Sequence, residues 1–155
     1  MPVRRRGPGR IAGALAAWLG LAVALGGSGP AHADPALDYV LHCMGCHGSR
    51  AEGVPGKVPP LARTLTRFMQ SPEGRDYLLR VPGAANSMLS DARLAEVLNW
   101  IAERYPGDAA GGAPARFTTA EVSASRHTPL PSVKAARHRL LQDLAATGAA
   151  PAEEY

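Results

Sequence analysis

Two cysteines constrain this chain more than any other feature of its sequence. Cys43 and Cys46 are its only cysteines, two residues separate them, and His47 follows directly. A structural zinc site needs four ligands, and this chain offers only two thiols and scattered histidines. A thioredoxin-type disulfide belongs in a βαβ context, which the sequence pattern does not show. A purely structural disulfide would leave the adjacent histidine unexplained.

The spacing Cys-x-x-Cys-His is the attachment sequence of a c-type haem. Two thiols at the end of a helix can each add across one vinyl group of neighbouring pyrroles, and the next residue is then brought under the iron. Thioether bonds retain the cofactor even in a small, partly exposed site. The motif predicts one covalent haem c, bound through Cys43 and Cys46, with His47 as an axial iron ligand.

Residues 1–33 have the three parts of a secretory signal peptide. A head with four arginines is followed by an apolar run over residues 11–25 and by small residues up to Ala33. The run is shorter than the roughly 20 residues of a membrane-spanning helix. We expect cleavage after Ala33 and a periplasmic protein without a stable membrane span. An uncleaved segment would instead anchor the protein in the membrane.

The charge of the chain does not support nucleic-acid binding. It has 17 Lys and Arg against 13 Asp and Glu, but four of the arginines lie in residues 1–33, so the expected mature protein is formally neutral. The basic pI of about 9.5 therefore reflects the arginines of the export segment.

Only 5% of the residues are aromatic, so a large planar apolar cofactor would help to fill a core.

Helix signals dominate the first half of the mature chain, which predicts an all-α fold class with a small helical domain. This prediction rests on capping residues, on a Pro in a first helical turn and on an apolar stripe at i, i+3, i+4 and i+7. We expect loops over residues 48–60 and 81–89. The predicted helices run from residue 34 or 35 into Cys43, over 61–69, from Ser71 through Leu79, and from Ser90 to Pro106.

The second half is predicted to be a linker and a helical C-terminal extension. Residues 106–116 are rich in Gly, Ala and Pro. Residues 117–155 begin with a capping-box pattern at Thr118 and Glu121, and an amphipathic helix around Leu140 follows. The extension is too small to bury a core of its own. It either wraps the first domain or docks on a partner protein.

The stretch from Leu37 to Tyr105 resembles the class I cytochrome c family, and we place the haem domain at residues 34–105. The resemblance implies helices packed around the haem, with the first and last helices crossing. It also implies that the carbonyl of Pro59 or Pro60 accepts a hydrogen bond from His47 Nδ1. The matching features are Tyr39 in the first helix, Cys-x-x-Cys-His-Gly, Pro59-Pro60-Leu61, Leu89-Ser90-Asp91 and the pair Trp100-Ile101.

The resemblance further implies that the sixth iron ligand is a methionine late in the domain, just before the last helix. Met88 occupies that place, although Leu89-Ser90-Asp91 follow it directly, where the family often has Met-Pro and a longer spacer. Thioether ligation raises the reduction potential and suits electron transfer. An open sixth site remains an alternative. Other candidate ligands are Met69 and the histidines, and we expect Met44 to point away from the iron and His42, His127 and His138 to be peripheral.

The predicted function is single-electron transfer rather than enzymatic catalysis, since no acid–base pair or nucleophile accompanies the motif. We expect a shuttle that carries electrons from a periplasmic dehydrogenase to an oxidase or another cytochrome. One alternative is a dedicated electron-accepting subunit, docked on one dehydrogenase through residues 117–155. Another is a haem enzyme or ligand sensor with an open sixth site.

Overall fold

The computed structural model of the chain describes residues 1, 34–107, 112–146 and 148. Apart from Met1, the predicted signal peptide lies outside the described residues, as does the end of the predicted extension. None of the helices in the described part is both long enough and apolar enough to cross a membrane. Those helices are α2 (Pro35–His42), α3 (Met44–His47), α4 (Thr64–Phe68), α5 (Pro72–Arg80), α6 (Pro82–Ala85), α7 (Asp91–Arg104), α8 (Thr119–Ser125) and α9 (Val133–Ala146).

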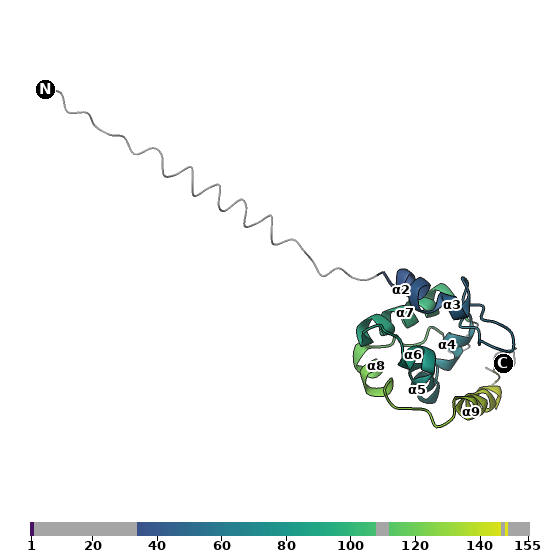
Figure 1. Ribbon diagram of the computed structural model, residues 1–155. Coiled ribbons are helices and arrows are strands. Elements are labelled where there is room, and N and C mark those ends of the chain that lie inside the picture. Colours follow the sequence, from purple (N-terminus) through teal and green to yellow (C-terminus); the bar gives the residue numbers. More distant parts are fainter. Residues whose placement is uncertain (2–33, 108–111, 147, 149–155) are drawn as a thin grey trace. The chain divides into compact units, whose positions relative to one another are not determined.

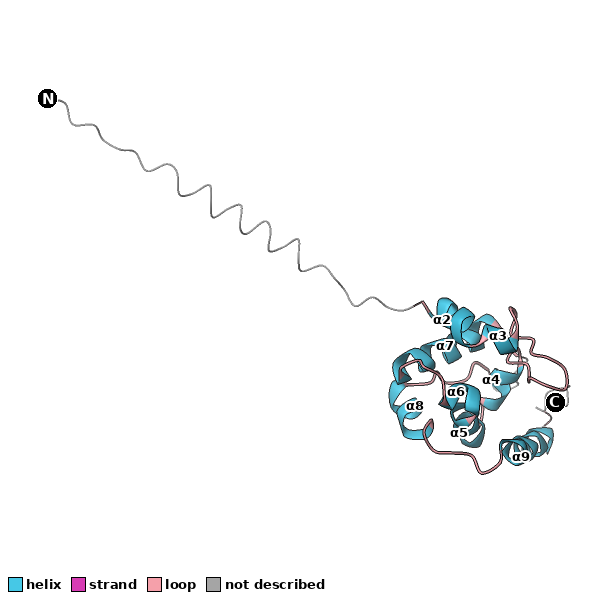
Figure 2. Cartoon of the chain, in the orientation of Figure 1, coloured by secondary structure: helices cyan, strands magenta, loops and turns pink. Residues whose placement is uncertain are grey.

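The all-α fold class is confirmed. The described elements are helices joined by loops (Figure 2), and the strand-like pairing among them is one isolated bridge between Val54 and Val58. The described residues from 34 onward belong to one compact unit. Local signals start the helices as expected: the Asp34 carboxylate accepts from the Ala36 N–H at 2.9 Å at the start of α2, and the Ser71 hydroxyl accepts from the Gly74 N–H at 3.1 Å at the start of α5.

The first and last helices of the domain, α2 and α7, pack against each other (Figure 1). The rings of Tyr39 and Trp100 meet between them with centroids 5.5 Å apart. Beside this ring pair, the fully buried carboxylate of Asp38 accepts from two nitrogens of Arg93. A buried carboxylate needs such a partner, because desolvation penalises an isolated charge. The contact therefore fixes the helix from which the Cys-x-x-Cys-His motif emerges.

Two boundaries differ from the sequence prediction. The helix expected over residues 61–69 begins only at Thr64, because the N–H groups of Leu61 and Ala62 are both bound to the Ala51 carbonyl and Arg63 has a φ of +66°. The loop expected over residues 81–89 contains the short helix α6. The interpretation of Pro82 as a loop residue is wrong, because Pro is favoured in the first turn of a helix and opens α6 here.

The described part of the extension packs on the domain that precedes it. Helix α8 contacts α5 and α7, and α9 contacts α5, which lies between them in Figure 1. Arg75 of α5 donates to both carboxylate oxygens of Glu121 at 2.6 and 2.7 Å, and its guanidinium carbon lies 4.3 Å from the ring centroid of Phe117. Arg80 donates to the carbonyls of Thr128 and Pro129 at 2.8 and 2.9 Å. Arginine side chains thus hold the extension at two places along its length.

Asn99 of α7 joins the extension to the domain interior. Its side-chain amide donates to the Phe117 carbonyl at 2.9 Å and its oxygen accepts from the Phe117 N–H at 2.7 Å, both within the buried core. The amide side chain thus satisfies the backbone N–H and C=O of Phe117, which have no helix or strand partner in the described structure.

We expect Asn99→Ala to lower the free energy of unfolding by about 2–4 kcal/mol, because it leaves a buried N–H and a buried C=O unpaired. Urea unfolding of the holoprotein followed by circular dichroism measures the change. Glu96→Gln, on the same helix, is the control and should change stability by less than about 0.5 kcal/mol. Equal stability of the two variants would contradict the role given to Asn99.

Candidate functional site

The three residues of the motif lie on one continuous turn. Cys43 ends α2, and α3 then carries Cys46 and His47. The N–H groups of Cys46 and His47 both bind the Cys43 carbonyl, at 3.2 and 3.0 Å, so the turn is closed by the backbone itself. Cys43 is half-buried, Cys46 is exposed, and the two thiols are not joined in a disulfide. Both sulfurs are therefore free to form thioethers.

The His47 ring is held by the loop that follows it. Its Nδ1 lies 3.0 Å from the Pro59 carbonyl, one of the two carbonyls that the family resemblance suggested. A carbonyl only accepts, so Nδ1 carries the proton and Nε2 keeps its lone pair. Burial lowers the pKa of His47, against the opposing effect of the bond to Pro59, and this favours a neutral ring. A neutral, oriented imidazole with a free Nε2 is a metal ligand.

Gly53 allows the loop to bring Pro59 to His47. The Gly53 N–H binds the His47 carbonyl at 2.8 Å, and its φ is +69°. A Cβ atom at this position would lie 2.4 Å from the Val58 carbonyl oxygen and 2.8 Å from the Pro59 carbonyl carbon. Only a glycine permits both the left-handed backbone and the close approach of residues 58 and 59.

Tyr39 ties the end of the motif back to α2. Its hydroxyl donates to the Gly48 carbonyl at 2.5 Å, directly after His47. Burial is the largest cause that raises the pKa of Tyr39 to about 12, so the phenol keeps the proton that makes this bond at neutral pH. Burial, followed by the nearby charge of Asp38, raises the pKa of the Cys43 thiol to about 11. Cys43 is consequently a neutral thiol at neutral pH.

Met88 stands between α6 and α7 and is 89% exposed, while Leu89 beside it is buried. Its thioether is therefore not a part of the protein core. Met69, by contrast, is 3% exposed and belongs to the hydrophobic core. Met44 is partly buried against that core. A buried thioether that fills core space serves packing, whereas an unpacked one is available to a ligand-binding site.

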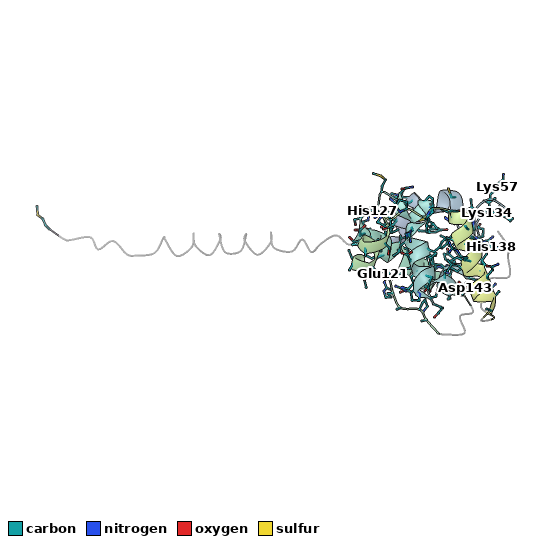
Figure 3. The ribbon with its side chains drawn as sticks, turned by 90° about the horizontal axis from the view of Figure 1, so that it is seen from below. Lys57, Glu121, His127, Lys134, His138 and Asp143 are labelled. Atoms are coloured by element: carbon teal, nitrogen blue, oxygen red, sulfur yellow. The ribbon has the colours of Figure 1, made fainter. Side chains whose placement is uncertain are left out.

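The histidines considered as alternatives lie at the surface. His42, His127 and His138 are exposed, and Figure 3 shows His138 on α9 beside Lys134. His138 Nε2 lies 3.1 Å from the Gln142 side-chain amide, one helix turn away. Within the described ranges no three His, Cys, Asp and Glu side chains gather as a metal site, so a zinc cluster has no support.

The donor set of this chain fits a covalent haem. Two unpaired thiols three residues apart, an imidazole oriented by Pro59 and an unpacked thioether are the groups that such a cofactor requires. Sequence analysis identified these residues but missed the groups that orient them: Asp38, Arg93, Gly53 and the Tyr39 hydroxyl. Of these, only Gly53 had a local signal, as a glycine in a loop. The Asp38–Arg93 pair joins positions 55 apart and has none.

Related proteins include two from Thermus thermophilus, each named cytochrome c-552. The chain is 36% identical to one of them over 103 residues, which cover 55% of this chain and 68% of the relative. It is 35% identical to the other over 95 residues, which cover 50% of this chain and 71% of the relative. No protein-family model matches the chain. The similarity therefore extends well beyond the five-residue motif.

We expect Gly53→Ala to destabilise the protein by about 2–4 kcal/mol, from a left-handed alanine and a clash with the backbone beside Pro59. Gly56→Ala is a matched control, because Gly56 has a φ of +70° and a Cβ there would meet nothing within 4 Å. It should cost only about 1 kcal/mol. Urea unfolding of both holoproteins measures the difference, and equal losses would show that close packing at Gly53 is unimportant.

Proposed function

Because this chain belongs to the c-type cytochrome family, we propose that it is an exported shuttle that passes single electrons between redox proteins. From its membership of this family it follows that the chain binds a covalent haem c and transfers electrons through it. It is an electron carrier rather than an enzyme. The proposal adds the residues that hold the haem, the compartment and the partners. The observation that supports it best is the pre-formed turn with two free thiols and an oriented His47.

In this proposal Cys43 and Cys46 hold the haem by thioether bonds, His47 Nε2 binds the iron, and Met88 supplies the sixth ligand. The haem, when bound, takes up and releases one electron at its iron. The protein residues do the rest: Pro59 keeps the proton on His47 Nδ1, Tyr39 holds the chain after His47, and a Met88 ligand would exclude water and oxygen from the iron. An iron whose coordination positions are all filled favours electron transfer over the binding of external ligands.

Export to the periplasm is supported by the arginine-rich head, the short apolar run and the small residues before Asp34. A periplasmic dehydrogenase as donor and an oxidase or second cytochrome as acceptor fit that compartment. No nucleic-acid role is proposed, since the formal charge of residues 34–155 is zero. The haem would be attached after transport of the unfolded chain.

The free shuttle is favoured over a subunit docked through residues 117–155. No large apolar side chain of the described extension is exposed, and Val122, Leu140 and Leu144 are buried in the hydrophobic core rather than offered to a partner. The long side chains that α9 exposes are polar or charged, and Figure 3 shows Lys134, His138 and Asp143 along it. A docking arm held by apolar contacts would need the opposite arrangement.

The mature protein, produced in a host competent for cytochrome maturation, should be red, begin at Asp34 and carry the mass of one haem. Mass spectrometry and a visible spectrum of the periplasmic fraction measure all three. A colourless protein without added porphyrin would overturn the function. A red protein that keeps residues 1–33 would contradict only the expected cleavage after Ala33, not the proposed electron transfer.

Met88→Ala should keep the covalent haem but lose the far-red charge-transfer band of methionine–iron ligation and lower the reduction potential. Its reduced form should bind carbon monoxide. Met69→Leu, which keeps the volume of a core side chain, is the control and should retain band and potential. If Met69→Leu loses the band and Met88→Ala keeps it, the ligand is Met69. A wild-type protein that is high-spin and binds carbon monoxide would support the open-site sensor.

A further inference from the structure

Arg126, at the end of α8, is an almost fully buried cation that the proposed function does not use. Its side chain is 4% exposed and reaches from the extension into the segment between α6 and α7. Its Nη2 donates to the Ser87 carbonyl at 2.7 Å and lies 3.4 and 3.5 Å from the carbonyls of Ala85 and Ala84. Its Nη1 donates to the Leu89 carbonyl and to the Asp91 carboxylate, both at 2.9 Å.

These bonds lie on both sides of Met88. The Ser87 carbonyl belongs to the peptide unit before Met88, and the Leu89 carbonyl belongs to the second unit after it. The unit between them is held as well, because the Leu89 N–H donates to the Ser87 hydroxyl at 3.2 Å. The backbone around Met88 is thus fixed largely by one planar guanidinium, while the Met88 side chain itself stays unpacked.

We propose that Arg126 is a positioning residue for the sixth iron ligand, so that the C-terminal extension completes the haem site. This inference rests on the proposed ligation by Met88. A fixed backbone sets the direction of the Met88 Cα–Cβ bond and reduces the conformations that its thioether has to give up on binding the iron. Asp91 offsets the guanidinium charge, and the four carbonyls accept from Nη1 and Nη2, while the buried Nε has no hydrogen-bond partner among the described residues.

Neighbouring arginines show that tethering the extension and holding this segment are separate tasks. Arg75 and Arg80 of α5 bind carbonyls and the Glu121 carboxylate of the extension, so they attach it to the domain. The hydrogen bonds described above for these two residues do not involve the segment from Ala84 to Asp91. Arg126, in contrast, belongs to the extension and binds the segment around Met88. Removing Arg75 should weaken the attachment of the extension, and it removes none of the hydrogen bonds that Arg126 makes to the segment around Met88.

The test compares three holoproteins with the wild type: Arg126→Gln, Arg126→Lys and the control Arg75→Gln. Each is unfolded in urea while the far-red methionine–iron band and the helix circular dichroism are recorded together. Carbon monoxide binding by the reduced protein and the reduction potential are measured without urea. Arg126→Lys keeps a buried cation but not the planar fork, so it separates the charge from the geometry and protects the test if Arg126→Gln folds poorly.

In Arg126→Gln we expect the band to disappear at lower urea than the helix signal, with a lower potential. We also expect a roughly ten- to hundredfold larger fraction of molecules with an open iron, the range for losing one or two charge-assisted hydrogen bonds. Arg126→Lys should be intermediate. In Arg75→Gln band and helix signal should disappear together, with an unchanged potential.

Two results would overturn the inference in distinguishable ways. If the wild type shows the band, Met88→Ala removes it, and both Arg126 variants keep the wild-type potential and lose band and helix signal together, then Arg126 only attaches the extension. If the wild type has no band, or Met88→Ala retains it, the assignment of Met88 fails and the role of Arg126 fails with it.

Discussion

The hydrogen bond from His47 Nδ1 to the Pro59 carbonyl, 3.0 Å long, is the interaction on which the rest of this structure depends. It fixes the orientation of the imidazole and keeps the proton on Nδ1, which leaves Nε2 free for the proposed bond to iron. The bond forms only if the loop turns tightly enough to return residue 59 to residue 47, and Gly53 permits that turn. The bond also requires that α2 is held in position. The contacts of Tyr39 and Asp38 with α7 hold it there. Fold and ligand geometry are therefore parts of one arrangement.

Sequence analysis identified the features whose cause is local. The caps at Ser71 and Ser90 each depend on one side chain and a backbone N–H three residues away, and both form as predicted; Asp34 caps the helix that was expected to open at residue 34 or 35. The stripe of α7 depends on the period of the helix alone. The motif is local as well, since its five positions form one turn. The all-α fold class followed from these patterns, and the comparisons and the structure agree with it.

Features with a non-local cause could not be predicted in this way. The start of α4 at Thr64 is set by the Ala51 carbonyl, which binds two N–H groups ten and eleven residues further along the chain. Arg75, Arg126 and Asn99 act on partners 18 to 46 residues away, and arginine on a polar helix face gives no sign of which carbonyl it will meet. The residues proposed to hold the haem could therefore be named from the sequence, whereas the residues that orient them could not.

The short spacing between Met88 and α7 leaves few residues of the segment itself to hold the backbone around Met88. Only Leu89 separates Met88 from Ser90, whose hydroxyl caps α7. The preceding helix α6 has four residues and ends at Ala85, which leaves the carbonyls of Ala84 and Ala85 near its end. The segment meets part of this need itself, since the Ser87 N–H donates to the Ala84 carbonyl at 3.2 Å. A guanidinium supplies several donors in one plane and is favoured at a carbonyl-rich helix end. If Met88 binds the iron as proposed, the arginine that follows α8 gives the extension a part in the haem site beyond that of a tether.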